Sequence, residues 1–126
     1  MARASRLVIK LTVGLDEPEK VAQAFSVATT ALASGVTVSF WLTGEASWFA
    51  LPGSASEFSL PHSAPLDHML AALIAGGTVT LCTQCAVRRN INDGDQIAGI
   101  RIAGAASFVE EIMGDATQAL VYYISS

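Results

Sequence analysis

The sequence predicts an α/β protein of three layers, in which helices cover both faces of a mostly parallel five-stranded sheet. Short β-branched runs alternate along the chain with stretches whose apolar residues recur every three or four positions. The connections carry helical sequence, which is the usual way to join parallel strands. A chain of 126 residues and 13.1 kDa suits one core, so we expect a single domain over residues 1–126.

Five runs are expected to form the strands. They are rich in β-branched or aromatic residues and are bounded by glycine or by polar turn residues. They cover residues 7–13, 36–42, 76–80, 99–103 and 118–123. Gly14 ends the first run, and a glycine pair begins the third. The sequence pattern therefore predicts five strands at these positions along the chain.

The first helix is predicted to begin at Asp16, which is a favoured N-cap residue. Pro18 falls in the first turn, and Glu19 follows three residues after the cap. Gly35 ends the helix. Its apolar residues share one face at helical spacing: Val21, Ala24, Phe25, Ala28 and Leu32.

The later segments follow the same alternation. Residues 43–53 are expected to form a turn and a short helix, and residues 54–62 a loop. The next helix begins at Ser63 to Pro65 and has the apolar face Leu66, Met69, Leu70, Leu73 and Ile74. Residues 86–89 read as a turn of helix and 105–113 as the last helix. Asn92 to Asp95 is interpreted as a turn, because it lacks the ligand spacing of a calcium loop.

Composition and charge exclude several classes of function. The chain is 52% hydrophobic and 14% charged, with a mean hydropathy of +0.47, so we expect part of its surface to meet another subunit. A net charge of −4 does not provide the basic stripe that nucleic acid requires. No apolar run reaches the roughly 18 residues of a membrane span, and Lys10 interrupts any signal-peptide core. We therefore expect a cytoplasmic protein with reduced thiols.

The only two cysteines, Cys82 and Cys85, fall where the third strand gives way to helix. A thiol in this place faces the positive end of a helix dipole and unpaired backbone N–H groups, which favour an anion. Arg88 and Arg89 follow Cys85 by three and four residues, so either can act as a counter-charge on the same helical face. Such surroundings lower the pKa of a cysteine from about 8.5, and the sequence predicts a reactive thiol here.

Several interpretations of this Cys-x-x-Cys motif compete. Structural zinc would need further ligands, but His62 and His68 are six residues apart across a proline, so we expect no metal. A thioredoxin-like disulfide motif belongs near the first strand of its domain, whereas this one follows the third strand. The third interpretation is a thiolate that accepts and hands on sulfur as a persulfide, helped by the other thiol. In the plainest interpretation Cys82 is a buried strand residue and both arginines are merely solvated.

Further pocket candidates follow the second and third strands, because open parallel sheets place their sites at the carboxyl edge. They are Gly44, Glu45, Trp48, Thr83 and Gln84. A carboxylate at the start of a helix is the commoner explanation for Glu45. Trp48 and its neighbour Phe49 suit a pocket, an interface or core packing.

Three segments together resemble the DsrE/DsrF-like family, which includes YchN-like proteins and sulfur-relay subunits. The segments are 40–45, 82–91 and 102–105, and the likeness follows nearly the whole chain in order. The resemblance implies a three-layer α/β/α domain that forms trimers or hexamers. It also implies a cysteine near a subunit interface and no organic cofactor.

The resemblance also bears on individual residues. Relay members carry the persulfide on a cysteine seven residues before the arginine of an Arg-Gly pair, and Cys82 stands seven before Arg89. YchN-like members have a second cysteine at the position of Cys85. Here Asn90 replaces the glycine of the pair, and asparagine can still form a left-handed helix cap.

These observations predict a sulfur-carrier or sulfurtransferase-like protein. Cys82 or Cys85 takes sulfane sulfur from a donor protein as a persulfide, Arg88 or Arg89 stabilises the negative sulfur, and the sulfur is passed to an acceptor or reduced. One alternative is a non-catalytic oligomeric binding or scaffold protein of the same fold. Another is a thiol-disulfide redox protein that uses the Cys82–Cys85 pair.

Overall fold

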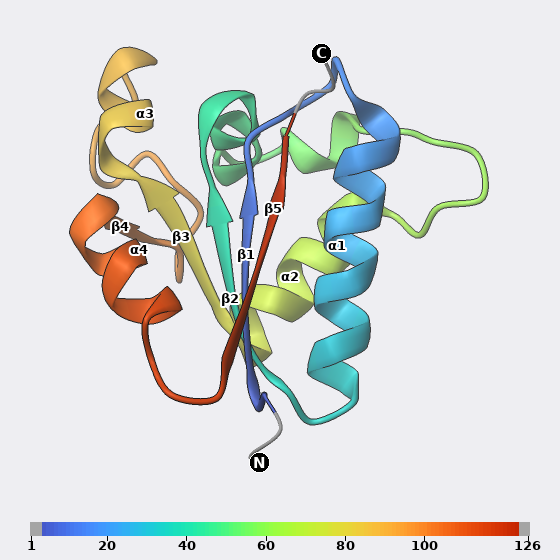
Figure 1. The fold of residues 1–126 in the computed structure, drawn as a ribbon. Helices are drawn as coiled ribbons and strands as arrows, with labels where there is room; N and C mark the ends of the chain where they lie inside the picture. The colour runs from blue at the N-terminus through green and yellow to red at the C-terminus, as the bar shows by residue number, and fades with distance from the viewer. Residues whose placement is uncertain (1–3, 124–126) are drawn as a thin grey trace.

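The computed structural model describes residues 4–123, which form a five-stranded sheet with helices on both faces (Figure 1). Every neighbouring pair of strands is parallel, in the order β4-β3-β2-β1-β5. The strands are β1 (Arg6–Leu11), β2 (Thr37–Leu42), β3 (Thr78–Cys82), β4 (Arg101–Ala103) and β5 (Thr117–Tyr122). The predicted α/β class and three-layer architecture are confirmed.

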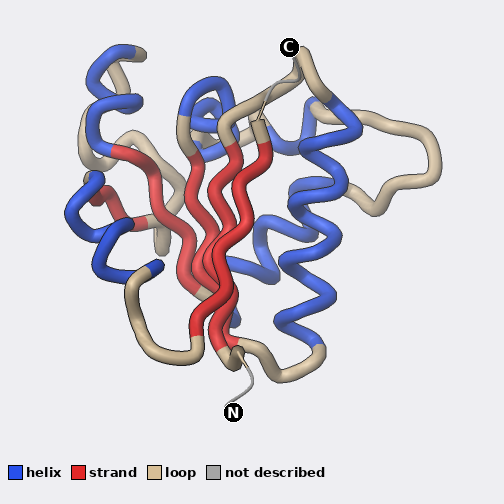
Figure 2. The backbone as a smooth tube through the Cα atoms, in the orientation of Figure 1, coloured by secondary structure: helices blue, strands red, loops and turns tan. Residues whose placement is uncertain are grey.

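The helices lie in two groups, as Figure 2 shows on either side of the strands. The two long helices, α1 (Pro18–Ala33) and α2 (Leu66–Gly76), cover one face. On the other side are the short α3 (Thr83–Arg88), which continues directly from β3, and α4 (Ala105–Ile112). Two 3-10 helices, η1 (Gly44–Ala50) and η2 (Ala55–Glu57), lie between β2 and α2.

The main core lies between the sheet and the two long helices. Alternate strand residues such as Ile9 and Phe40 are 0% exposed, as are Phe25 and Leu73 from the helices. The rings of Phe25 and Phe40 pack with their centroids 4.6 Å apart. The apolar faces predicted from helical spacing therefore face this core, although Leu32 and Ile74 are only partly buried at its margin.

The opposite face of the sheet carries a polar network beneath α4. Glu111 accepts hydrogen bonds from the Ser39 hydroxyl, from Trp41 Nε1 at 3.2 Å and from Arg101. Arg101 Nε also donates to Thr80 Oγ1 at 2.6 Å. Burial raises the pKa of Glu111, but these donors outweigh it and hold the pKa below its ordinary value. The network thus joins α4 to β2, β3 and β4.

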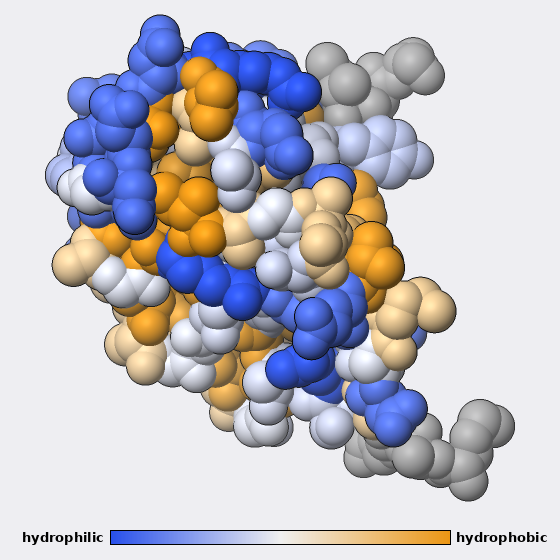
Figure 3. Space-filling view, turned by 90° about the vertical axis from the view of Figure 1, so that its left-hand side faces the viewer, coloured by the Kyte–Doolittle hydropathy of each residue, from blue (hydrophilic) through white to orange (hydrophobic). Residues whose placement is uncertain are grey.

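Much of α4 is open to solvent, since none of its residues is fully buried. Phe108 contacts the ring of Trp41 edge-on at 5.3 Å, whereas Val109 and Met113 are exposed. Val87 of α3 is exposed as well. Figure 3, which views the molecule from the side of α3 and α4, shows hydrophobic residues gathered between hydrophilic ones. The helices on this side of the sheet therefore leave more apolar side chains exposed than a fully packed layer would.

The predicted N-cap at Asp16 is wrong. The first helix begins at Pro18, with Glu17 in the cap position and no side-chain cap hydrogen bond. Asp16 Oδ1 instead accepts a hydrogen bond from the Gly14 backbone N–H at 3.1 Å. The carboxylate satisfies the turn before the helix, a competing local hydrogen bond that aspartate commonly makes.

Other boundaries differ from the sequence prediction by a few residues. The first strand ends at Leu11 rather than at residue 13, and α3 begins at Thr83 rather than at 86. The predicted loop over 54–62 contains η2, and α2 is capped by Pro65. Residues 92–95 form a turn as predicted. Within residues 4–123, no helix has both the length and the apolar character needed to cross a bilayer.

Candidate thiol site

The two cysteines lie at the carboxyl edge of the sheet, between β2 and β3. Cys82 is the last residue of β3, and α3 follows without a loop, so the helix begins three residues earlier than the sequence predicts. The parallel register pairs Leu42 of β2 with Leu81 of β3. The segment that leaves β2 therefore lies beside the first turn of α3, and this brings Gly44 next to Cys85.

The backbone N–H of Gly44 donates a hydrogen bond to Cys85 Sγ at 3.2 Å. Gly44 has a φ of +51°, and a Cβ atom there would lie only 2.5 Å from the carbonyl oxygen of Thr12. A residue without a side chain is needed for the chain to pass this close to the end of β1. The glycine thus allows the backbone to present its N–H to the sulfur.

The surroundings of Cys85 favour its thiolate. Burial of the side chain raises the pKa of the thiol, but the Gly44 N–H, a hydrogen bond with Cys82 and the positive charges of Arg89 and Arg88 all lower it. The lowering causes prevail, so the pKa of Cys85 lies below its ordinary value. This thiol is therefore ionised to a greater extent at neutral pH than an ordinary cysteine, and the thiolate is the nucleophile.

Arg89 is fixed at the end of α3 by three hydrogen bonds. Its Nη2 and Nε donate to Oε2 of Glu45 at 2.8 and 3.3 Å, and its Nη1 donates to the carbonyl oxygen of Cys85 at 3.2 Å. Exposed ion pairs contribute little to stability, so the main effect of the pair is to hold the guanidinium beside the cysteine. Arg88 is exposed, and it acts on Cys85 through its charge.

The end of α3 depends on Asn90, which has a φ of +57°. The Ile91 N–H bonds to the Ala86 carbonyl at 2.9 Å, and the Asn90 N–H bonds to the Val87 carbonyl at 3.1 Å. This pattern closes the helix through a left-handed residue. The structure confirms that asparagine takes the cap conformation predicted for this position.

Cys82 has different surroundings. It occupies the N-cap position of α3 and is partly exposed, whereas Cys85 is only 9% exposed. Its S–H lies 3.8 Å from Oε1 of Gln84, which is a weak hydrogen bond. The more accessible thiol and the thiol with the lowered pKa are thus different residues three positions apart.

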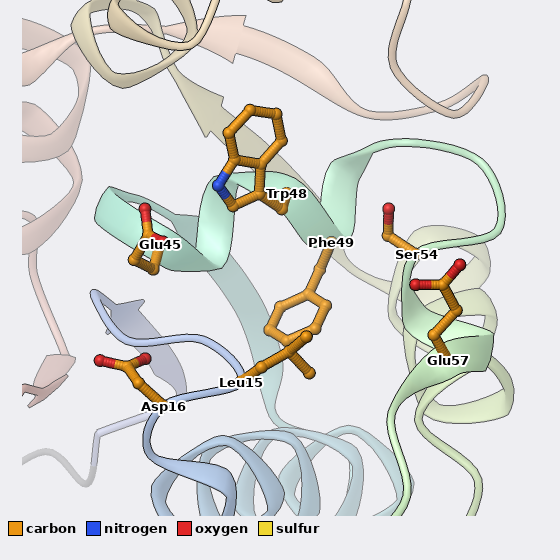
Figure 4. A pocket seen from close by; sticks show the side chains of 7 residues that line it. All are labelled: Leu15, Asp16, Glu45, Trp48, Phe49, Ser54 and Glu57. Carbon is orange, nitrogen blue, oxygen red and sulfur yellow. The ribbon is translucent and has the colours of Figure 1, made fainter.

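A pocket of about 300 Å³, shown in Figure 4, is linked to the thiol site through Glu45, which lines the pocket and pairs with Arg89. Its lining residues come from the turn after β1, from η1 and from the region of η2: Leu15, Asp16, Glu45, Trp48, Phe49, Ser54 and Glu57. Two of the predicted pocket candidates, Glu45 and Trp48, are among them. The other candidates, Gly44, Thr83 and Gln84, are not.

Sequence reasoning missed several parts of the site. It placed Gly44 near the pocket but did not anticipate that its N–H would bond to Cys85, because this contact depends on the register between β2 and β3. It also missed Leu15, Asp16 and Glu57 as lining residues. One signal could have indicated these lining residues: the carboxyl ends of β1 and β2 lie at the same edge of a parallel sheet.

The potential metal ligands of the chain lie apart. Cys82 and Cys85 have no histidine partner, since His62 lies in a loop and His68 on the exposed side of α2. Among the described residues 4–123, no group of three His, Cys, Asp or Glu side chains is placed to hold a metal ion.

The fold and the site define a class of protein: a parallel α/β domain with a pair of free thiols at the carboxyl edge of its sheet. The model of the DsrE/DsrF-like family matches residues 6–120. The chain therefore belongs to the DsrE/DsrF-like family, which is linked to sulfur relay.

Solved structures share this fold. The YchN protein of E. coli is 20% identical over 94% of this chain and 99% of its own, with a TM-score of 0.76. MTH1491 of Methanobacterium thermoautotrophicum, a protein of unknown function, is 11% identical over 92% of this chain and 97% of its own, with a TM-score of 0.72. A comparison with curated proteins finds no match.

Proposed function

We propose that this protein is a sulfur carrier that holds sulfane sulfur as a persulfide on Cys85. The observation that carries the proposal is the hydrogen bond from the Gly44 N–H to Cys85 Sγ, together with the lowered pKa of that thiol. Membership of a family linked to sulfur relay supports the choice of sulfur as cargo. The chemistry uses protein thiols and requires no organic cofactor.

Loading is a thiolate displacement. The Cys85 thiolate attacks the outer sulfur of a donor persulfide, the sulfur–sulfur bond of the donor breaks, and the donor leaves as a thiolate. The outer sulfur is then bound to Cys85, and no external oxidant is consumed. Arg89 and the Gly44 N–H stabilise negative charge on sulfur at both stages. Transfer to an acceptor thiolate repeats the same reaction in the opposite sense.

Cys82 provides a second outcome for the loaded sulfur. Its thiolate attacks Cys85 Sγ, expels hydrosulfide and leaves a Cys82–Cys85 disulfide, so the carried sulfur is reduced as the two cysteines are oxidised. A dithiol reductant must then restore the thiols before another cycle. Cys82 suits this role because it lies at the N-cap of α3, three residues before Cys85, and helps to lower the pKa of Cys85.

We further propose that the protein works in the cytoplasm as a homo-oligomer, a trimer or hexamer, that receives sulfur from a donor protein and delivers it to an acceptor protein. Exposed apolar residues on α3 and α4, including Val87, Val109 and Met113, support a subunit contact on this side. Cys85 lies in α3 and Cys82 in its N-cap position, and Figure 1 shows α3 on the same side as α4.

The experiment is to incubate the reduced protein with glutathione persulfide and to measure its intact mass. We expect Cys82→Ser to retain one added sulfur and Cys85→Ser to gain none, whereas the loaded wild-type chain releases its sulfur as hydrosulfide and becomes the Cys82–Cys85 disulfide. Hydrosulfide release and disulfide formation should be lost in Cys82→Ser. If Cys85→Ser gains the added sulfur, Cys82 is the carrier; if neither thiol loads, the scaffold alternative is favoured.

A further inference from the structure

The pocket beside the thiol site combines exposed apolar walls with acidic groups. Leu15, Trp48 and Phe49 form its apolar part, and Leu15 and Trp48 remain 63% and 39% exposed. Apolar surface left uncovered in a concavity is favourable for burying a ligand. A volume of about 300 Å³ is at the small end of ligand pockets and suits a molecule with about one ring.

The charged groups that line the pocket are all carboxylates. In Figure 4, Asp16 and Glu45 lie on one side of Leu15 and Phe49, and Glu57 lies on the other. No lysine, arginine or histidine is among the lining residues in the described part of the chain. The pocket therefore disfavours anions.

These carboxylates keep acceptor capacity for a ligand. Glu45 uses Oε2 for Arg89, and Asp16 uses Oδ1 for the Gly14 N–H, so each retains a second oxygen. The side chain of Glu57 makes no hydrogen bond or ion pair within residues 4–123. An ionised carboxylate can accept about four hydrogen bonds, so cationic N–H donors have places to bind.

The arrangement favours an organic cation over a metal ion. A calcium ion needs six to eight oxygen ligands at about 2.3–2.6 Å. The described residues form no cluster that could hold a metal, and in Figure 4 apolar side chains separate Glu57 from Asp16 and Glu45. A ligand that joins an ammonium group to an apolar body suits both the carboxylates and the apolar walls of the pocket. Its charge pairs with the carboxylates, and its apolar body covers Trp48. The ring of Trp48 also attracts cations.

We propose that this pocket binds a small organic cation in which an ammonium or amidinium group is joined to an apolar or aromatic body. This binding site is separate from the sulfur chemistry proposed above. The two sites share Glu45, which lines the pocket and holds Arg89 beside Cys85. A cation bound at Glu45 adds positive charge near the thiol, so an occupied pocket lowers the pKa of Cys85 further.

The test is a calorimetric titration of the reduced full-length protein at low salt with three probes of similar shape. They are phenethylammonium, neutral 2-phenylethanol and anionic 3-phenylpropionate. We expect phenethylammonium to bind saturably and about tenfold more tightly than either of the others. Glu57→Gln and Glu45→Gln should each weaken its binding several-fold. Glu110→Gln, an exposed carboxylate on α4, is the matched control and should leave the affinity unchanged.

The proposal is overturned if phenethylammonium shows no saturable binding, or if the neutral probe binds as tightly. It is also overturned if Glu110→Gln weakens binding as much as Glu57→Gln does. No sulfur donor is present in the titration. If the cation does not bind, the persulfide proposal is therefore unaffected. If sulfur does not load on Cys85, the proposal of cation binding is unaffected.

Discussion

Gly44 and Cys85 are 41 residues apart in the sequence, yet the N–H of one lies 3.2 Å from the sulfur of the other. The contact exists because β2 and β3 are parallel neighbours whose carboxyl ends meet at one edge of the sheet. The sulfur in this contact, Cys85 Sγ, is the atom that carries the persulfide in the proposed function.

Replacing Gly44 with alanine should raise the pKa of Cys85. The new Cβ would clash with the Thr12 carbonyl at 2.5 Å, so the backbone must move and its N–H leaves the sulfur. The measurement is the pH dependence of alkylation by iodoacetamide in a Cys82→Ser background. Gly35→Ala is the control: its φ of +87° costs about 1–2 kcal/mol of stability, but nothing within 4 Å links it to the thiol. Equal alkylation profiles for both variants would contradict the role of Gly44.

Removing the charge of Arg89 should also raise the pKa of Cys85, and by more than removing that of Arg88. Both cations lower this pKa, and Arg89 has the larger effect. The thiolate fraction at neutral pH should therefore fall in the order wild type, Arg88→Gln, Arg89→Gln. Alkylation rates at a fixed pH near 7 measure this order directly. A faster reaction in Arg89→Gln would show that the guanidinium does not stabilise the thiolate.

Glu111 should contribute stability that depends on pH. Its pKa is lowered in the folded protein, so its contribution is present above its unfolded pKa of about 4.3 and is lost as pH falls through the folded pKa. At pH 7, Glu111→Gln should cost about 1–3 kcal/mol in the free energy of unfolding, because it weakens hydrogen bonds to a charged acceptor.

Urea denaturation of wild type and Glu111→Gln between pH 3 and 7 tests this expectation. The difference between their free energies of unfolding should become smaller as the pH falls toward 3. Glu110→Gln is the neighbouring control, since Glu110 is exposed. If the difference in the free energy of unfolding stays constant with pH, packing rather than charge accounts for the lower stability of Glu111→Gln.

Two buried serines should respond oppositely to alanine. Within the described residues, Ser47 Oγ is buried without a hydrogen-bond partner, so Ser47→Ala should leave stability unchanged or raise it by about 1 kcal/mol. Ser39 donates to Glu111, so Ser39→Ala should lower stability by about 1–2 kcal/mol. Thermal unfolding of both variants provides the comparison. A loss of stability in Ser47→Ala would reveal a partner for its hydroxyl.

Local patterns were sufficient to predict most of the fold. The helical spacing of Val21, Phe25 and Ala28 identified the buried face of α1, and the change of period at Cys82 located the end of β3. Asp16 misled the prediction because a short carboxylate can satisfy either a helix or the turn before it. The surrounding structure decides which of the nearby N–H donors the carboxylate accepts from.

The site was predictable only where it is local in sequence. Cys82, Cys85 and Arg89 lie within eight positions, so helical spacing placed them together. The partners of these residues, Gly44 and Glu45, come from the start of η1 just after β2, and their contacts depend on the register between β2 and β3. The pocket adds Glu57 from η2, a helix that the loop-like composition of residues 54–62 concealed.

The recessed position of Cys85 has a consequence for the shape of any partner. The residue is 9% exposed and lies under the backbone of Gly44, so a flat protein surface cannot bring a sulfur atom into bonding range. Under the proposed function, we expect a donor to present its persulfide on a narrow, protruding tip or a flexible tail. We expect the same recess to slow attack on this thiolate by bulky disulfides more than attack by small oxidants.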